Sequence, residues 1–335
     1  MSLPVIKYCP GTLAEGFNSY SPSFLRRMFD GKKVSHILAY DTPRNNEEEM
    51  EKFLDNRKRI SISGVQEKLS MLLDKNQLRL TEEGETGTYI LKPIPIDLKK
   101  PGQLPANEHL TMQIASQVYG IDTAVNGLIF FKDGSPAHIT RRFDVKKDGS
   151  KWAKEDFATL AGKTKETGGE NFKYDYSYQE AGTLITRFVP AWRVEMEKFF
   201  SLVVFNYLFS NGDAHLKNFA LLETASGDHF LSPAYDLMNT RIHVSDTDFA
   251  LNKGLFADDF SSPVFKRFHH PGLEDFMVFA ARIGIETKRA QKLLAPFLER
   301  QEKAMALIER SFLDEPAKRT FELGYNSRKN FLTKE

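Results

Sequence analysis

Asp213 and Asn218 are separated by four residues in the sequence NGDAHLKN, which directly follows a long apolar run. A second acid, Asp236, comes later, in SPAYDLMN. Phosphoryl transfer from ATP uses one carboxylate to orient a hydroxyl nucleophile, and an amide and a further carboxylate to hold Mg²⁺. An acid, an amide and an acid in this order therefore make phosphoryl transfer the first hypothesis.

Two charged residues upstream fit the same chemistry. Lys92 stands inside the apolar strand pattern TYILKPIP, and Glu108 stands in the expected first turn of an amphipathic helix, LPANEHLTMQIASQVYG. Lysine is rare in a buried strand unless it is paired, and kinases pair a strand Lys with a helix Glu beside the ATP phosphates. The alternatives are that Lys92 extends into solvent and that Glu108 only complements the helix dipole.

The remaining patterns predict a strand-rich first part and a helical second part. The segments KLSMLLD and QLRL alternate as strands do, and GLIFF with AHITRRFD predicts a hairpin. SISGVQEK, at 61–68, is expected to be a small loop between strands that covers nucleotide phosphates, and the alternative is a plain hairpin. We place the boundary near Val145, which gives domains at 1–145 and 146–335.

Composition limits the class of protein. The 335 residues contain 46 Lys and Arg against 45 Asp and Glu, so nucleic acid is not required as the main partner. One cysteine, Cys9, suits a reducing cytosol. The N-terminus lacks a secretory pattern, and the longest apolar run, Phe199–Phe209, is too short to span a bilayer. We expect a cytoplasmic protein without a membrane partner.

The order of these parts is that of protein kinases: small loop, strand Lys, helix Glu, a hinge near 141–143, Asp-x4-Asn, and a second acid. The usual signatures are absent, because there is no GxGxxG, Asp213 follows Asn-Gly rather than His-Arg, and Asp236 is in YDLM rather than DFG. A standard eukaryotic-type kinase is therefore excluded.

At this level of detail the chain resembles the HipA-like serine/threonine kinase toxins of bacterial toxin–antitoxin systems. The matching segments are SISGVQEKL (61–69), ILKP (90–93), NEH (107–109), RRFD (141–144), EDF (155–157), NGDAHLKNF (211–219), PAYDL (233–237) and HVSDTDFALNKG (243–254). The resemblance implies an α+β, two-lobed protein-kinase-like fold, with a β-rich N-lobe and a mostly helical C-lobe, and it implies ATP and Mg²⁺ as cofactors.

The resemblance also assigns roles to residues. Asp213 is implied to be catalytic, and Asn218 and Asp236 to be metal ligands. The implied nucleotide contacts are Ser63, Gly64, Val65, Gln66, Lys68, Lys92, Glu108, Arg141, Phe143, His215 and Lys217. For Arg141 and Phe143 the backbone groups of a hinge are meant. For His215 the alternative is a polar residue that steadies the loop.

Two serines are implied sites of autophosphorylation. Ser61 matches the family's modified serine, and Ser63 is a second hydroxyl two residues on. A phosphate there adds nearly two negative charges beside the ATP phosphates, which should lower the affinity for ATP.

The N-terminal part differs from that of the longer family members. Only about 60 residues precede SISG, so the chain is similar to the short toxin of three-gene HipBST-type systems. That likeness implies a separate small antitoxin that replaces a missing N-terminal subdomain, a DNA-binding antitoxin, and an aminoacyl-tRNA synthetase, the tryptophanyl enzyme, as substrate. The alternatives are a small-molecule kinase of the same fold and an inactive kinase-like binding module in a repressor complex.

Overall fold

The computed structural model describes residues 4–42, 67–95, 99–245 and 247–334. The chain folds into two compact units. The first unit consists of residues 1–113, 124–151 and 306–318, and the second of residues 114–123, 152–305 and 319–335. The division into functional domains at 1–145 and 146–335 stays a prediction.

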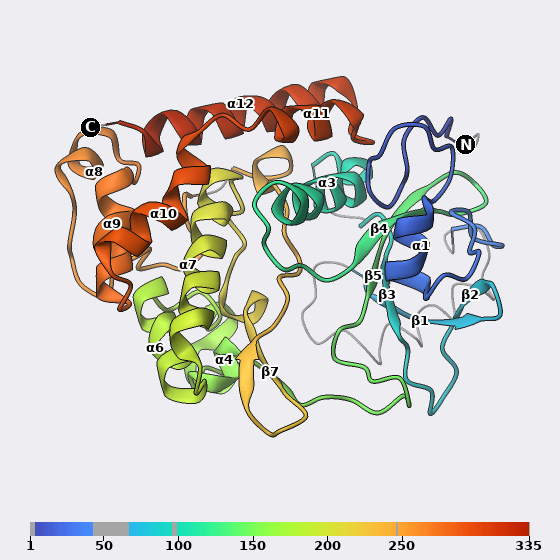
Figure 1. Cartoon of the computed structure of the whole chain (residues 1–335), viewed down its shortest axis with the longest axis horizontal. Coiled ribbons are helices and arrows are strands. Elements are labelled where there is room, and N and C mark those ends of the chain that lie inside the picture. Colours follow the sequence, from blue (N-terminus) through green and yellow to red (C-terminus); the bar gives the residue numbers. More distant parts are fainter. Residues whose placement is uncertain (1–3, 43–66, 96–98, 246, 335) are drawn as a thin grey trace. The chain divides into compact units, whose positions relative to one another are not determined.

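A five-stranded antiparallel sheet forms the centre of the first unit (Figure 1), with the strand order β2-β1-β3-β5-β4. Its strands are β1 (Leu69–Asp74), β2 (Gln77–Leu80), β3 (Tyr89–Lys92), β4 (Asn126–Phe130) and β5 (Pro136–Arg141). Alternation predicted β1 and β2, an apolar run predicted β3, and a hairpin pattern predicted β4 and β5. Lys75 adopts a left-handed conformation (φ 53°) at the expected turn between β1 and β2.

Helix α1 (Pro22–Phe29) covers apolar side chains of this sheet. It begins after Ser21, whose hydroxyl accepts a hydrogen bond from the backbone N–H of Phe24. Phe24, Met28 and Phe29 then join the buried cluster that contains Leu69, Met71, Leu91 and Ile139 of the strands. This cluster holds β1, β3 and β5 in place, and β3 carries Lys92.

Helix α3 (Leu104–Gln117) follows the short 3₁₀ helix η2 (Pro101–Gln103) and is buried from Leu104 to Ala115 on every side. The expectation of an amphipathic helix was therefore wrong. Its polar residues stay inside because they bond to one another and to the sheet, as when Gln113 Nε2 donates to Asn126 Oδ1. Glu108 is the fifth helical residue and lies beyond the first turn, so the helix dipole does not explain its position.

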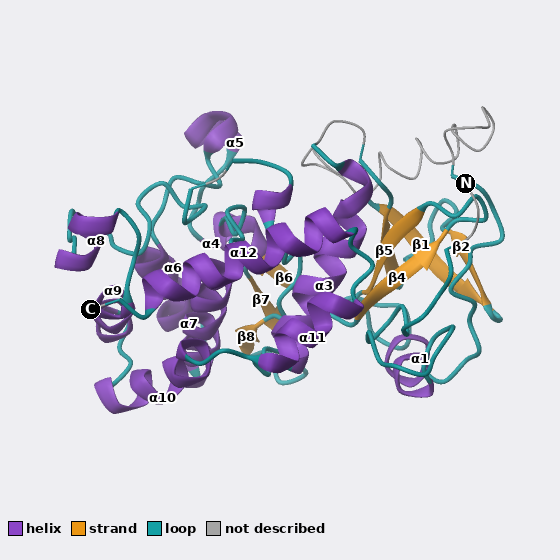
Figure 2. Cartoon of the chain, turned by 90° about the horizontal axis from the view of Figure 1, so that it is seen from above, coloured by secondary structure: helices purple, strands orange, loops and turns teal. Residues whose placement is uncertain are grey.

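The second unit is mostly helical (Figure 2). Its helices, including the two that also contribute residues to the first unit, are α4 (Phe157–Leu160), α5 (Lys165–Gly168), α6 (Tyr178–Phe188), α7 (Trp192–Leu208), α8 (Pro263–Phe268), α9 (Leu273–Arg282), α10 (Thr287–Leu298), α11 (Glu302–Arg310) and α12 (Glu315–Leu332). From Phe199 onwards α7 is buried on nearly all sides, in keeping with its apolar sequence. A break after Leu298 separates α10 from α11.

A three-stranded antiparallel sheet, ordered β6-β7-β8, lies among these helices. It consists of β6 (Lys154–Asp156), β7 (Ala220–Glu223) and β8 (His229–Leu231). β6 lies in a polar stretch of the sequence. No helix in the described part of the chain is long and apolar enough to cross a membrane.

Candidate functional site

The loop that carries Asp213 starts at a sharp turn after α7. Ser210 has a left-handed backbone (φ 54°), and its carbonyl accepts hydrogen bonds from both the backbone N–H and the hydroxyl of Thr240. The Thr240 oxygen in turn accepts the N–H of Gly212 at 2.9 Å. Asn211 is buried and donates to the side chain of Asn206 on α7. The polar residues after the apolar helix therefore fix where the loop leaves it.

Asp213 presents a carboxylate that is partly open to solvent, with 46% of the side chain exposed. Its Oδ1 accepts a hydrogen bond of 2.9 Å from the hydroxyl of Tyr174, whereas His215 Nε2 is 3.8 Å from the same oxygen. A carboxylate that is both accessible and oriented can accept a proton from an incoming hydroxyl group.

Asn218 is tied directly to Asp213. Its Nδ2 donates to the backbone carbonyl of Asp213 at 2.8 Å, which identifies the nitrogen end of the amide. The other end is therefore an oxygen, and amide and carboxylate oxygens are the ligands that Mg²⁺ takes in proteins. Asn218 together with the carboxylate of Asp236 fits the donor set expected for Mg²⁺.

Asp236 comes five residues after β8 and has a left-handed backbone (φ 56°). Few non-glycine residues adopt this conformation, and those that do are concentrated in turns and functional sites. The preceding residue, Tyr235, donates its hydroxyl to the carbonyl of Lys217 at 2.9 Å. The segment of Asp236 is thus bonded to the residue adjacent to Asn218.

His215 is buried beside these groups. Desolvation, followed by the positive charge of Lys173, lowers the pKa of its imidazole to about 3, and Asp236 acts in the opposite direction. His215 is thus neutral near pH 7, and its backbone N–H donates to the Asp213 carbonyl at 2.8 Å. Lys217 holds its ammonium 5.9 Å from the ring of Phe172. The roles of His215 and Lys217 as nucleotide contacts stay predictions.

Lys92 and Glu108 form the corresponding feature of the first unit. Lys92 Nζ donates to Glu108 Oε1 at 2.6 Å, and the two side chains are 3% and 0% exposed. The other carboxylate oxygen of Glu108 is 3.2 Å from Nδ1 of the equally buried His138. The pairing predicted from a strand Lys and a helix Glu is present, and Lys92 does not extend into solvent.

Arg141, Phe143 and Lys68 are the other predicted nucleotide contacts of the first unit that lie among the described residues. The backbone N–H of Arg141 donates to the Val125 carbonyl, and its guanidinium pairs with Asp30 at 2.8 Å. The N–H of Arg141 is thus engaged within the sheet. Phe143 follows β5, and Lys68 directly precedes β1. Ser61, Ser63, Gly64, Val65 and Gln66 lie outside the described residues.

A segment that the sequence did not single out holds the Asp213 loop. Besides the bond from Tyr174 to Asp213, Tyr178 donates its hydroxyl to the Ala214 carbonyl at 2.9 Å, and the N–H of Leu216 donates to the Lys173 carbonyl at 3.1 Å. The signal was present in the spaced tyrosines of KYDYSY, at 173–178. We call residues 173–178 the tyrosine strap.

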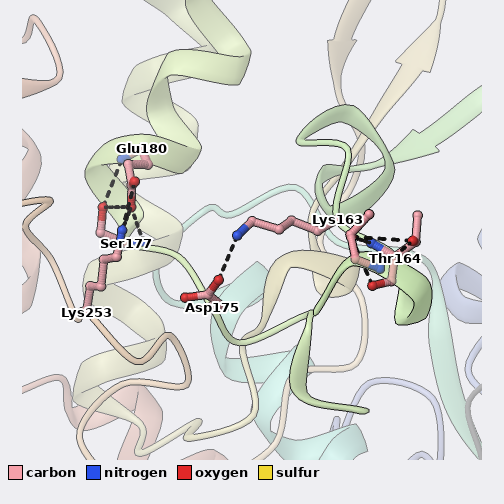
Figure 3. Close-up of polar contacts among 7 residues, drawn as sticks. Lys163, Thr164, Asp175, Ser177, Glu180 and Lys253 are labelled. Carbon is pink, nitrogen blue, oxygen red and sulfur yellow. Dashed lines mark hydrogen bonds and ion pairs between the residues drawn. The ribbon is translucent and has the colours of Figure 1, made fainter. Parts of the chain in front are cut away.

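Figure 3 shows polar contacts of Asp175 and Ser177, two further residues of the tyrosine strap. Asp175 pairs with Lys163 at 2.7 Å, and Ser177 caps α6 through reciprocal bonds with Glu180. Glu180 also pairs with Lys253 at 3.1 Å. Backbone bonds join the strap to the same later segment, since the N–H groups of Asn252 and Lys253 donate to the carbonyls of Tyr174 and Tyr176.

That later segment also forms part of the wall of a cavity of about 610 Å³. Asn252, Lys253 and Gly254 line it, together with aromatic residues such as Phe256 and Phe260. Asp213, Asn218 and Asp236 are not among its lining residues. The cavity and the Asp213 loop are therefore distinct features, and the tyrosine strap bonds to residues of both.

Solved structures show which known fold this is. The chain is similar to Shewanella oneidensis HipA, determined in a complex with HipB and operator DNA, with a TM-score of 0.63 and 19% identity over 88% of this chain and 74% of that one. It is also similar to the Helicobacter pylori proinflammatory kinase CtkA, with a TM-score of 0.51 and 16% identity over 78% of this chain and 93% of that one. The expected α+β kinase-like fold is confirmed.

Sequence comparison gives relatives over most of the chain. A Haemophilus influenzae protein named "Putative kinase" is 26% identical over 321 residues, which cover 90% of this chain and 89% of the relative. A Sinorhizobium fredii protein with a similar name is 31% identical over 191 residues, but the match spans only 43% of that longer relative. The family model described as HipA-like C-terminal domain matches residues 60–305, and the chain therefore belongs to the HipA-like C-terminal domain family.

Proposed function

We propose that this chain is an ATP- and Mg²⁺-dependent serine/threonine protein kinase that acts in the cytoplasm as the toxin of a bacterial toxin–antitoxin system. The observation that carries the proposal is the direct bond from Asn218 Nδ2 to the Asp213 carbonyl, 2.8 Å, beside a carboxylate that is partly exposed. This bond supports the proposal because it joins, within one short loop, the two residues proposed as base and metal ligand. The buried pair of Lys92 and Glu108 supports the same chemistry.

The proposed reaction is transfer of the γ-phosphoryl group of ATP to a serine or threonine hydroxyl. The hydroxyl oxygen bonds to the γ-phosphorus, the bond from phosphorus to the β–γ bridging oxygen breaks, and ADP leaves. Asp213 orients the hydroxyl and accepts its proton. Lys92, held by Glu108, places a positive charge for the phosphates. Mg²⁺, held by Asn218 and Asp236, would neutralise charge on the phosphate oxygens.

The proposed protein substrate is an aminoacyl-tRNA synthetase, with the tryptophanyl enzyme first, and its phosphorylation would arrest translation and growth. The proposed partners are a small antitoxin and a DNA-binding antitoxin. The Shewanella HipA structure, a complex with HipB and operator DNA, supports an antitoxin partner of the second kind. Phosphorylation of Ser61 or Ser63 is proposed to lower the affinity for ATP.

Transfer of labelled phosphate tests this proposal. Purified wild type and Asp213→Asn are incubated with Mg²⁺ and γ-labelled ATP in a bacterial extract, and labelled proteins and phosphorylated sites of the kinase are identified by mass spectrometry. We expect label in a synthetase, and at Ser61 or Ser63, with the wild type only. Equal labelling by both proteins would exclude Asp213 as the base. Label confined to sugars or other small molecules would favour a small-molecule kinase, and no transfer at all would favour a binding module.

A further inference from the structure

Tyr174 makes a side-chain contact to the carboxylate that the proposed function places at the centre of the reaction. Its hydroxyl donates to Asp213 Oδ1 at 2.9 Å. A hydrogen bond from a neutral hydroxyl to a carboxylate is charge-assisted and therefore stronger and more directional than a neutral one. The neighbouring His215 Nε2, at 3.8 Å from the same oxygen, is beyond hydrogen-bond distance.

The ring of Tyr174 is itself held on several sides. Its edge meets the ring of His215 with centroids 5.2 Å apart at 73°, and the Lys173 ammonium is 5.0 Å from its centroid. Its backbone N–H donates to Asn171, and its carbonyl accepts the N–H groups of Tyr176 and Asn252. A tyrosine restrained in this way presents its hydroxyl in one direction, and an oriented donor restricts the carboxylate to which it bonds.

The backbone bonds of Tyr174 also reach a second region of the same unit. Asn252, whose N–H donates to the Tyr174 carbonyl at 2.9 Å, lines the 610 Å³ cavity. One residue therefore bonds through its backbone to the cavity wall and through its side chain to Asp213.

We propose that Tyr174 is the positioning residue of Asp213: its hydroxyl holds the carboxylate in the orientation that accepts the proton of the substrate hydroxyl. The proposal rests on the proposed function, since it assigns Asp213 the role of base. Tyr174 acts through Asp213 and takes no part in bond making. Its loss should therefore slow the transfer step and leave the binding of nucleotide unchanged.

The chain supplies a matched control two residues away. Tyr176 lies in the same tyrosine strap, and its side chain contributes a cation–π contact with Lys163 at 5.8 Å, which a phenylalanine would retain. The Tyr176 hydroxyl makes no hydrogen bond to the residues that the structure describes, in contrast to that of Tyr174. Tyr174→Phe and Tyr176→Phe therefore each delete one phenolic hydroxyl. Only the hydroxyl of Tyr174 donates a hydrogen bond to Asp213.

The test compares wild type, Tyr174→Phe, Tyr176→Phe and Asp213→Asn in steady-state phosphorylation of a protein substrate. We expect Tyr174→Phe to lower kcat by about ten-fold, as for loss of one hydrogen bond to a charged group. The KM for ATP, the equilibrium binding of ADP and the thermal unfolding midpoint should match those of Tyr176→Phe. A general structural role would instead change the unfolding midpoint and nucleotide binding together with kcat.

Two results would overturn the positioning role of Tyr174. A third, different result would overturn the proposed function. If Tyr174→Phe has the kcat of Tyr176→Phe while Asp213→Asn is inactive, Asp213 is the base and Tyr174 does not position it. If Tyr174→Phe loses activity only together with its folding midpoint, the hydroxyl serves stability. If Asp213→Asn retains wild-type activity, the proposed function itself is wrong.

Discussion

Lys92 Nζ and Glu108 Oε1 are 2.6 Å apart in a place where neither side chain is more than 3% exposed. Removal of two charges from water costs several kcal/mol, and their attraction offsets this cost only while both are present. The neighbouring His138, 3.2 Å from the second carboxylate oxygen, is as deeply buried. Removal of one partner alone should therefore destabilise the fold, whereas removal of both should cost less stability. Comparison of single and double variants can thus separate the structural role of the pair from its functional role.

Lys92→Met should lower the free energy of unfolding by about 3–5 kcal/mol, because it leaves a buried carboxylate without its cation. The double variant Lys92→Met/Glu108→Met removes both charges and should recover about half of that loss or more. Urea denaturation of each variant measures these changes. Lys33→Met, at an exposed lysine of the same unit, is the control and should stay near wild type.

Nucleotide binding by the double variant separates the two roles of Lys92. If Lys92 binds phosphates, the double variant is stable but binds ATP weakly. Recovery of both stability and ATP affinity would show that Lys92 serves only to neutralise Glu108. A single variant as stable as Lys33→Met would contradict the burial argument itself.

Asn218 joins the Asp213 backbone to the proposed metal site. Asn218→Ala removes both the bond to the Asp213 carbonyl and the oxygen available to a cation. We expect the Mg²⁺ concentration for half-maximal activity to rise by about ten-fold or more, as for the loss of a group that supports a metal site. The measurement is a Mg²⁺ titration of phosphate transfer at saturating ATP.

Asn218→Asp keeps a ligand oxygen but replaces the N–H donor. It should lower kcat, because a carboxylate oxygen would then face the Asp213 carbonyl, and it should require less Mg²⁺ than Asn218→Ala. Asn330→Ala, at an exposed position of α12, is the control. An Asn218→Ala protein with the Mg²⁺ dependence of this control would show that Asn218 does not bind the metal.

The strands and the Lys92–Glu108 pair were predictable because they depend on local pattern. Alternation, an apolar run and a hairpin pattern predicted β1 to β5, and a lysine in an apolar strand indicated a buried partner. Burial of α3 was not predictable in the same way. Thr111 donates to the Asn107 carbonyl, and Gln113 donates to Asn126 on β4. Tertiary partners made these polar residues compatible with the interior.

The Asp213 loop was predictable in its residue types but not in its supports. Its spacing of Asp213 and Asn218 is local, and the chemistry of the two side chains indicated their use. Tyr174 is 39 positions from Asp213, in a segment without helix or strand periodicity. Its contact depends on how the tyrosine strap folds against the loop, which no local pattern specifies.

His109 gives the fold of the first unit a dependence on pH. Its side chain is 1% exposed, and Nε2 has no hydrogen-bond partner among the described residues. Desolvation, followed by the charge of His138, lowers the pKa of His109 to about 3, and a bond with Gly11 offsets part of this. Because the unfolded chain binds the proton near pH 6.5 and the folded protein does not, acid favours unfolding between pH 6.5 and 3.

The sign and size of this effect can be measured. Between pH 7.5 and 5.5 His109 alone should lower the free energy of unfolding by about 1.4 kcal/mol, and His215, whose pKa is also lowered to about 3, adds in the same direction. His109→Gln should reduce the loss over this interval by about 1.4 kcal/mol relative to wild type. His269→Asn, at an exposed histidine, is the comparison variant. Equal slopes for His109→Gln and wild type would mean that His109 binds its proton over the same pH range in the folded and the unfolded protein, and that burial does not lower its pKa.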